Sequence, residues 1–226
     1  MSFDLKELLE YLGLHGWQAL IVVCIFFTVW VVFSNDKGSN FVAKKIVEKF
    51  STIISTIHKE KQITSEKMSR EIDLVLHQLR EETDATNALV VRYRNGNYDS
   101  IGSSILKFYA TNEKTKPGFL QIGDKIQEIS RSLYGNFCDT LLKEHKVYIK
   151  DKTSITDEDA ELQSVMKLFG KAEKFYAHSL VTTSDHQIVG FVCLVYTEPQ
   201  KVAESKIDAA ITAAAERIVG KLELVL

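Results

Sequence analysis

The sequence predicts an α+β protein with one N-terminal transmembrane helix, a helical stalk, and then an antiparallel sheet with flanking helices. Three observations support this prediction. An apolar run without ionisable side chains lies near the N-terminus, and a long charged segment free of Gly and Pro follows it. Beyond residue 86, short β-rich runs alternate with amphipathic stretches, which is typical of a sheet covered by helices.

Residues 1–16 form a short leader in which leucines recur at helical spacing between charged residues. The single apolar face of this leader would allow it to lie flat at a membrane interface. A frayed, polar extension of the following span explains the same pattern, and the sequence leaves both interpretations open.

Residues 17–34 are predicted to cross a membrane. The run WQALIVVCIFFTVWVVF has 17 residues, which as a helix span about 25 Å, just short of the ~30 Å hydrocarbon core of a bilayer. The run has no polar stripe, whereas a core helix of a soluble domain usually keeps one. Aromatic rings near both ends favour the headgroup level. The side chains that we expect in the span are Trp17, Ile21, Val23, Phe27, Trp30 and Phe33.

Charges on the two sides of the span bear on its orientation. Lys6 is the only basic residue before the span, whereas Lys37, Lys44, Lys45 and Lys49 follow it. The positive-inside rule therefore favours a cytoplasmic C-terminal part.

Residues 39–86 are predicted to form the helical stalk. Apolar side chains recur there at spacings of four and three, in one stripe near the membrane and a second near the C-terminal domain. Such stripes suit pairing with a second copy of the chain. A single helix packed on the chain's own domain is the alternative. The self-association residues are Ile46, Phe50, Ile53, Ile57, Ile72, Val75 and Leu79.

Residues 87–226 are predicted to form one domain. Strands are expected over 88–93, 105–111, 146–150, 175–183 and 188–197, and helices over 125–145, 156–169 and 204–224. The pair Asn95-Gly96 predicts a turn after the first strand. Alanines and isoleucines give the last helix one apolar face.

No motif in the sequence indicates catalysis, a cofactor or a metal site, and the net charge of −2 gives no reason to expect a nucleic-acid partner. Cys138 and Cys193 are expected in the core. Arg92 and Arg94 could hold an anion, although we favour charges that protect a sheet edge. Glu113, with the lysines beside it, is expected in a solvated loop. We therefore expect that the protein is not an enzyme.

The last third of the chain resembles the GAF domain and, more broadly, PAS-like modules. The resemblance rests on the strand AHSL at 177–180, the strand IVGFV at 188–192 and the helical sequence AAAERIV at 213–219. It implies a sensor module over residues 87–226 that binds a small ligand or a protein regulator.

The whole layout resembles the holins of T-even bacteriophages. The local similarities are Tyr93, Arg94, Asn95, Tyr98, Tyr109, Ala110, Glu113, Gly190, Tyr196, Ala214, Arg217, Ile218 and Gly220. The cysteines that this family pairs correspond to Ser179 and Thr212, so that bridge is absent here. The resemblance implies a single-pass protein of the inner (cytoplasmic) membrane that forms homo-oligomers and permeabilises the bilayer during lysis.

Two functions therefore remain after the sequence analysis. The leading expectation is a holin-like lysis protein, whose domain would face the periplasm. The alternative is a membrane-anchored sensor or interaction protein whose cytoplasmic GAF/PAS-like domain binds a ligand or a partner. The side of the membrane on which the domain lies would distinguish the two.

Overall fold

The computed structural model describes residues 39–98, 104–151, 155, 159–184 and 186–223, and only the backbone of residues 39–50, 53–54, 57–58, 60–61, 95–98 and 104–106 within them. The chain divides into two units, residues 1–63 and residues 64–226. The second unit contains the sheet and the helices that pack on it. It starts earlier than the domain expected from the sequence, because it includes the second half of the long helix.

A six-stranded antiparallel sheet forms the centre of the second unit, with the order β3-β2-β1-β6-β5-β4. Strand β6 is apolar almost throughout and β1 is apolar over residues 88–91, because both faces of the sheet are covered there. The strands are β1 (Asn87–Tyr98), β2 (Ser104–Thr115), β3 (Ile129–Ser130), β4 (Lys146–Ile149), β5 (Lys174–Val181) and β6 (Ile188–Tyr196).

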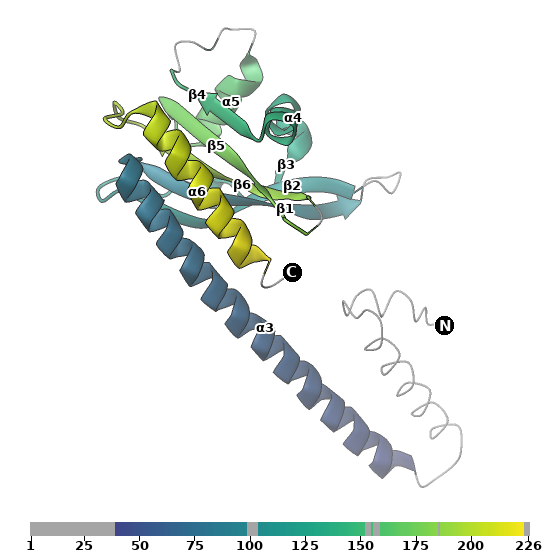
Figure 1. Ribbon diagram of the computed structural model, residues 1–226. Helices are drawn as coiled ribbons and strands as arrows, with labels where there is room; N and C mark the ends of the chain where they lie inside the picture. Colours follow the sequence, from purple (N-terminus) through teal and green to yellow (C-terminus); the bar gives the residue numbers. More distant parts are fainter. Residues whose placement is uncertain (1–38, 99–103, 152–154, 156–158, 185, 224–226) are drawn as a thin grey trace. The chain divides into compact units, whose positions relative to one another are not determined.

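Helices cover both faces of this sheet (Figure 1). Helix α3 (Ser39–Thr83) and helix α6 (Glu204–Leu222) share one apolar core with the sheet, and α4 (Gly135–Glu144) and α5 (Ala160–Leu168) share the other. Strand β1 shows how the sequence supplies both cores. Ala88 and Val90 belong to the α3/α6 core, whereas Leu89 and Val91 belong to the α4/α5 core, as side-chain alternation in a strand requires.

Helix α3 begins at the expected residue and ends three residues before the expected bound of 86. Its second half packs on the sheet. Ile72, Val75 and Leu79 are 1%, 3% and 3% exposed and lie in the α3/α6 core together with Leu76. The second half of α3 therefore packs on the chain's own domain, as the alternative to pairing with a second copy expected. Its buried side chains cannot also contact a second copy of the chain.

The expectation of one helix over residues 125–145 was wrong in its first half. That stretch contains the 3-10 helix η1 (Gly123–Lys125), strand β3 and the 3-10 helix η2 (Arg131–Tyr134) before α4 begins. Glu128 has a positive φ of 55°, which interrupts a helix, and Ile129 pairs with Phe108 at the sheet edge. The turn expected at Asn95-Gly96 was also misplaced, since β1 continues to Tyr98.

Candidate functional site

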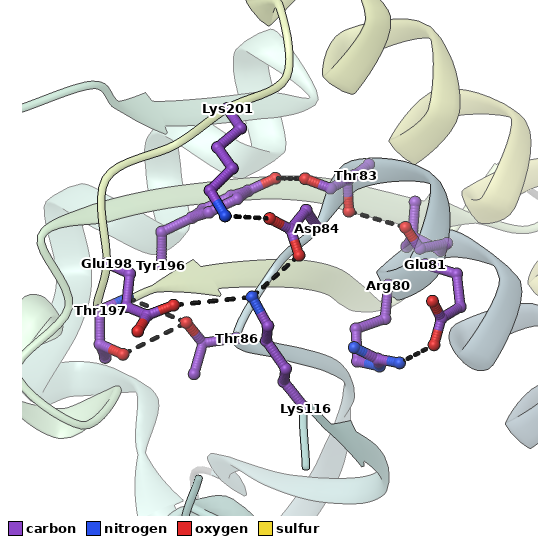
Figure 2. A network of polar contacts seen from close by, with 11 residues as sticks. Arg80, Glu81, Thr83, Asp84, Thr86, Lys116, Tyr196, Thr197, Glu198 and Lys201 are labelled. Atoms are coloured by element: carbon purple, nitrogen blue, oxygen red, sulfur yellow. Dashed lines mark hydrogen bonds and ion pairs between the residues drawn. The ribbon is translucent and has the colours of Figure 1, made fainter. Parts of the chain in front are cut away.

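The end of α3 lies at a junction with the sheet that is rich in polar contacts (Figure 2). Asp84, directly after the helix, has a positive φ of 52°, a conformation in which Asp is several-fold enriched among non-glycine residues. Its carboxylate accepts a hydrogen bond of 2.9 Å from the Lys116 ammonium at the end of β2, and Lys201 Nζ lies 3.9 Å away. Lys116 also lies 3.6 Å from the Glu198 carboxylate. The helix end is thus joined to two separate loops.

Strand β6 holds the same helix end through buried hydroxyl groups. Tyr196, which is 2% exposed, donates its hydroxyl to the Thr83 carbonyl at 3.1 Å. The Thr197 amide donates to the Thr86 hydroxyl at 3.1 Å. Since Tyr196 and Thr197 end β6, any displacement of this strand reaches the last turn of α3 directly.

Further along α3, the side chain of Asn112 fixes the helix on β2. Asn112 is 8% exposed, and its amide donates to the Ser69 carbonyl at 3.1 Å, the Ser69 hydroxyl at 2.9 Å and the Asp73 carboxylate at 2.9 Å. Lys114 lies 2.7 Å from Asp73. A buried amide with several partners specifies one register of the helix on the sheet, because any other register leaves it unsatisfied.

Two ion pairs between α3 or its end and the rest of the domain shift the pKa values of their members. The hydrogen bond from Lys116 lowers the pKa of Asp84, and the same contact raises the pKa of Lys116. On the α6 side, Lys221 lies 2.7 Å from Glu71 and lowers the pKa of that carboxyl group. These groups therefore keep their charges at neutral pH.

Glu113 forms a second polar centre, at the end of β2 on the opposite face of the sheet. Its carboxylate accepts hydrogen bonds from the amides of Ile122 at 3.0 Å and Gly123 at 2.8 Å, and from the Asn87 side chain at 2.8 Å. A Cβ atom at Gly123 would lie 2.9 Å from a Glu113 oxygen, so a larger residue there would push the carboxylate aside. The expectation of a solvated loop was wrong for Glu113 and Lys114, which lie in β2, whereas Lys116 directly follows the strand.

Aromatic rings fill the core between the sheet and α4/α5. Phe137 and Phe169 contact Phe175 and Phe191, with ring centroids 4.7 to 6.4 Å apart. These four rings are at most 1% exposed. This core is packed with the chain's own side chains, so a ligand that binds here must displace some of them.

Two polar groups face this aromatic core. The Tyr93 hydroxyl is buried beside the Cys138 thiol, which interacts with it, but it makes no hydrogen bond of standard geometry with any described residue. Burial raises the pKa of both groups, and burial also raises the pKa of the Cys193 thiol. Both cysteines are free and fully buried, in agreement with the sequence. Because thiolates and not thiols are nucleophiles, neither cysteine is suited to catalysis at neutral pH.

The side chains expected in the membrane span, Trp17, Ile21, Val23, Phe27, Trp30 and Phe33, lie outside the described residues, as do those of Ile46, Phe50, Ile53 and Ile57. Across the described residues, no helix is both long and apolar enough to cross a membrane. The same part of the chain contains no group of three potential metal ligands.

Sequence reasoning missed the junction at the end of α3. Its members are scattered over four elements, and hydroxyl and amide side chains such as Thr83 and Asn112 give no sequence signal that separates them from surface residues. The available signal was the end of the long amphipathic pattern itself, which places a helix end near residue 83.

No family model matches the chain, and no curated protein matches it either. Solved structures do match. The GAF domain of PixJ from Thermosynechococcus elongatus is 15% identical, with 71% of this chain and 88% of that chain covered and a TM-score of 0.53. GAF3 of Slr1393 from Synechocystis sp. PCC6803 is 11% identical, with 69% and 92% covered and a TM-score of 0.51.

A third match is the GAF domain region of a protein named as a membrane protein from Geobacter sulfurreducens PCA. It is 14% identical, with 73% of this chain and 99% of that chain covered and a TM-score of 0.50. The C-terminal part of the chain therefore has a GAF domain fold, as expected from its last third. The comparisons give no evidence for the resemblance to T-even holins, and they favour the alternative function over the leading one.

Proposed function

We propose that the chain is a regulatory protein whose GAF-like domain binds a small ligand or a protein partner and transmits that event to helix α3. The observation that carries the proposal is the attachment of α3 to the sheet, through the buried Asn112 amide in its middle and the Tyr196 hydroxyl at its end. A helix held in one register at two points moves with the sheet, which is the property that a transmitting element needs.

The proposed input is the α4/α5 face. Because aromatic side chains fill this face, an incoming ligand or partner must shift α4 or the rings beneath it. Strands β1 and β6 contribute side chains to both cores, so a shift on one face changes the packing of the other. One structure with the same fold is named as the blue-light absorbing form of the PixJ GAF domain, which supports a domain that receives a signal. We propose no catalytic step.

The remaining sequence expectations belong to the same proposal. The apolar run 17–34 would anchor the chain in the inner membrane, and the basic residues after it favour a cytoplasmic domain. The stripe formed by Ile46, Phe50, Ile53 and Ile57 would join two copies of α3. Binding at the domain would then change how the two helices meet.

The test introduces a displacement in the α4/α5 face and measures its effect at α3. In the full chain in detergent micelles, Cys138→Met overpacks the fully buried side of α4, and Leu142→Met changes the exposed side of the same helix as a control. Hydrogen exchange is measured by mass spectrometry. We expect Cys138→Met to accelerate exchange at residues 69–83, and Leu142→Met to leave it unchanged.

A change confined to α4 and its immediate strand neighbours would contradict transmission. Thermal unfolding of each variant is measured in parallel. If Cys138→Met exchanges faster throughout the domain, the milder Cys138→Val is used to repeat the comparison.

A further inference from the structure

Arg92 lies on a central strand, on the α3/α6 face of the sheet. Strand β1 pairs with β2 on one side and with β6 on the other. Arg92 continues the alternation of Ala88 and Val90, which belong to the α3/α6 core. Protection of a sheet edge, the role favoured from the sequence, therefore does not apply to this residue.

The guanidinium group of Arg92 has no partner in the described part of the chain. Its Nε atom is buried and makes no hydrogen bond, and no described carboxylate forms an ion pair with it. The residue opposite on β6 is Gly190, where a Cβ atom would lie 2.1 Å from the Val91 carbonyl oxygen. Strand β6 thus supplies no side chain directly opposite Arg92.

A second unpaired cation follows on the same face. Arg94 is exposed, lies two residues along β1 and is opposite Lys107 on β2. Lys107 is paired with Glu128 at 3.2 Å, whereas no described carboxylate is paired with Arg94. The two arginines therefore form a locally uncompensated positive site on one face of one strand.

We propose that Arg92 and Arg94 bind a phosphate-type oxyanion. Buried donors in native proteins almost always have an acceptor, and a buried donor without one is costly. A phosphate group would satisfy Arg92 Nε and a neighbouring N–H together, because the planar guanidinium matches a pair of oxyanion oxygens. The phosphate group could be a free anion or the headgroup of a lipid, since both present the same oxygens.

The experiment uses the full chain and two sources of phosphate. In nonionic detergent, the melting temperature is measured with inorganic phosphate and with chloride at equal ionic strength. In vesicles, it is measured in phosphatidylcholine with and without phosphatidylglycerol. The variants are Arg92→Met, Arg92→Lys and Arg94→Met, and the charge-matched control is Arg217→Met on the exposed side of α6.

We expect phosphate to raise the melting temperature of the wild type and the control. Each Arg92 variant should weaken the apparent affinity by about tenfold or more, which is the loss expected for a hydrogen bond to a charged group. Arg92→Met should melt in chloride at or above the wild-type temperature, because it removes an unpaired donor. Stabilisation by inorganic phosphate identifies a free anion as the ligand, and stabilisation by phosphatidylglycerol alone identifies a headgroup.

Two results would overturn the proposal. The first is the absence of stabilisation by either source of phosphate. The second is stabilisation that both Arg92→Met and Arg94→Met retain in full. If Arg92→Met fails to fold, Arg92→Lys and the exposed Arg94→Met decide the question, because neither removes a packed core side chain.

Discussion

His178 is a half-buried residue on β5 that lies among other charged groups. Burial is the main cause that lowers its pKa, and the nearby Lys146 and His145 add to the effect, while Asp208 on α6 opposes it. Its Nδ1 lies 2.9 Å from the Ser179 carbonyl oxygen. This contact fits a neutral ring with the proton on Nδ1.

The lowered pKa of His178 predicts a loss of stability at mildly acidic pH. Between the folded pKa and the ordinary value of about 6.5, the unfolded chain binds more protons than the native state, so the free energy of unfolding falls as pH decreases through this range. We expect His178→Gln to reduce this dependence as the pH falls below about 6.5.

Urea unfolding of the full chain at a series of pH values measures the effect. The pKa of Asp208 is lowered by Lys146 and Tyr148, so its contribution disappears only as pH falls below about 4. The two windows are therefore separate. If the free energy of unfolding of His178→Gln depends on pH as it does in the wild type, His178 does not cause the loss of stability at mildly acidic pH.

The sequence predicts whether a single residue is buried better than it predicts which residues that residue contacts. Cys138 and Cys193 were expected in the core and are there, since a small apolar side chain needs only its strand or helix pattern to be placed. Arg92 and Glu113 were assigned to an edge and a loop because their roles depend on which strands are neighbours. Strand order is set by long-range pairing, which a local pattern does not contain.

At the scale of elements, α3 offers a direct test of which of its faces packs on the sheet. Leu76 is fully buried in the α3/α6 core, and Leu74, two residues earlier, is 64% exposed. Leu76→Ala should lower the free energy of unfolding by about 2–5 kcal/mol, because it removes buried methyl groups and leaves a cavity. Leu74→Ala should change it by no more than about 0.5 kcal/mol.

Chemical denaturation of the two variants under identical conditions measures the two free energies of unfolding. Both substitutions remove the same atoms from the same helix and have the same helix propensity, so the difference reports burial alone. Equal losses in the two variants would mean that α3 does not pack on the sheet in the register described here.

Long periodic elements were predicted well, and short ones were not. The bounds of α6, β5 and β6 agree with the sequence to within two residues and those of α3 to within three, because each has a strong apolar period. Residues 125–134 were expected to be helical because Ile126 and Ile129 have helical spacing. Their burial instead follows from η1 and from the pairing of β3 with β2, where tertiary contacts override local propensity.

At the scale of the whole molecule, the start of the folded unit has a measurable consequence. The sequence placed the domain at residues 87–226, but the compact unit begins at Thr64. A fragment of residues 84–226 lacks four side chains of the α3/α6 core, Ile72, Val75, Leu76 and Leu79. It also lacks Ser69 and Asp73, the partners of the buried Asn112 amide.

We therefore expect residues 64–226 to unfold in one cooperative thermal transition, and residues 84–226 to aggregate or to melt without one. Removing the helix exposes the apolar face of the sheet and takes away the acceptors of the Asn112 amide, and the lost apolar burial alone costs on the order of several kcal/mol against a typical total of 5–15. Circular dichroism and calorimetry of the two fragments provide the measurement. A fragment of residues 64–226 that carries Asn112→Leu separates the hydrogen bonds of Asn112 from the apolar packing of α3, because the variant loses the hydrogen bonds and keeps the packing. If residues 84–226 melt as cooperatively as residues 64–226, the second half of α3 is not part of the domain core, and the route from the sheet to this helix that underlies the proposed function is lost with it.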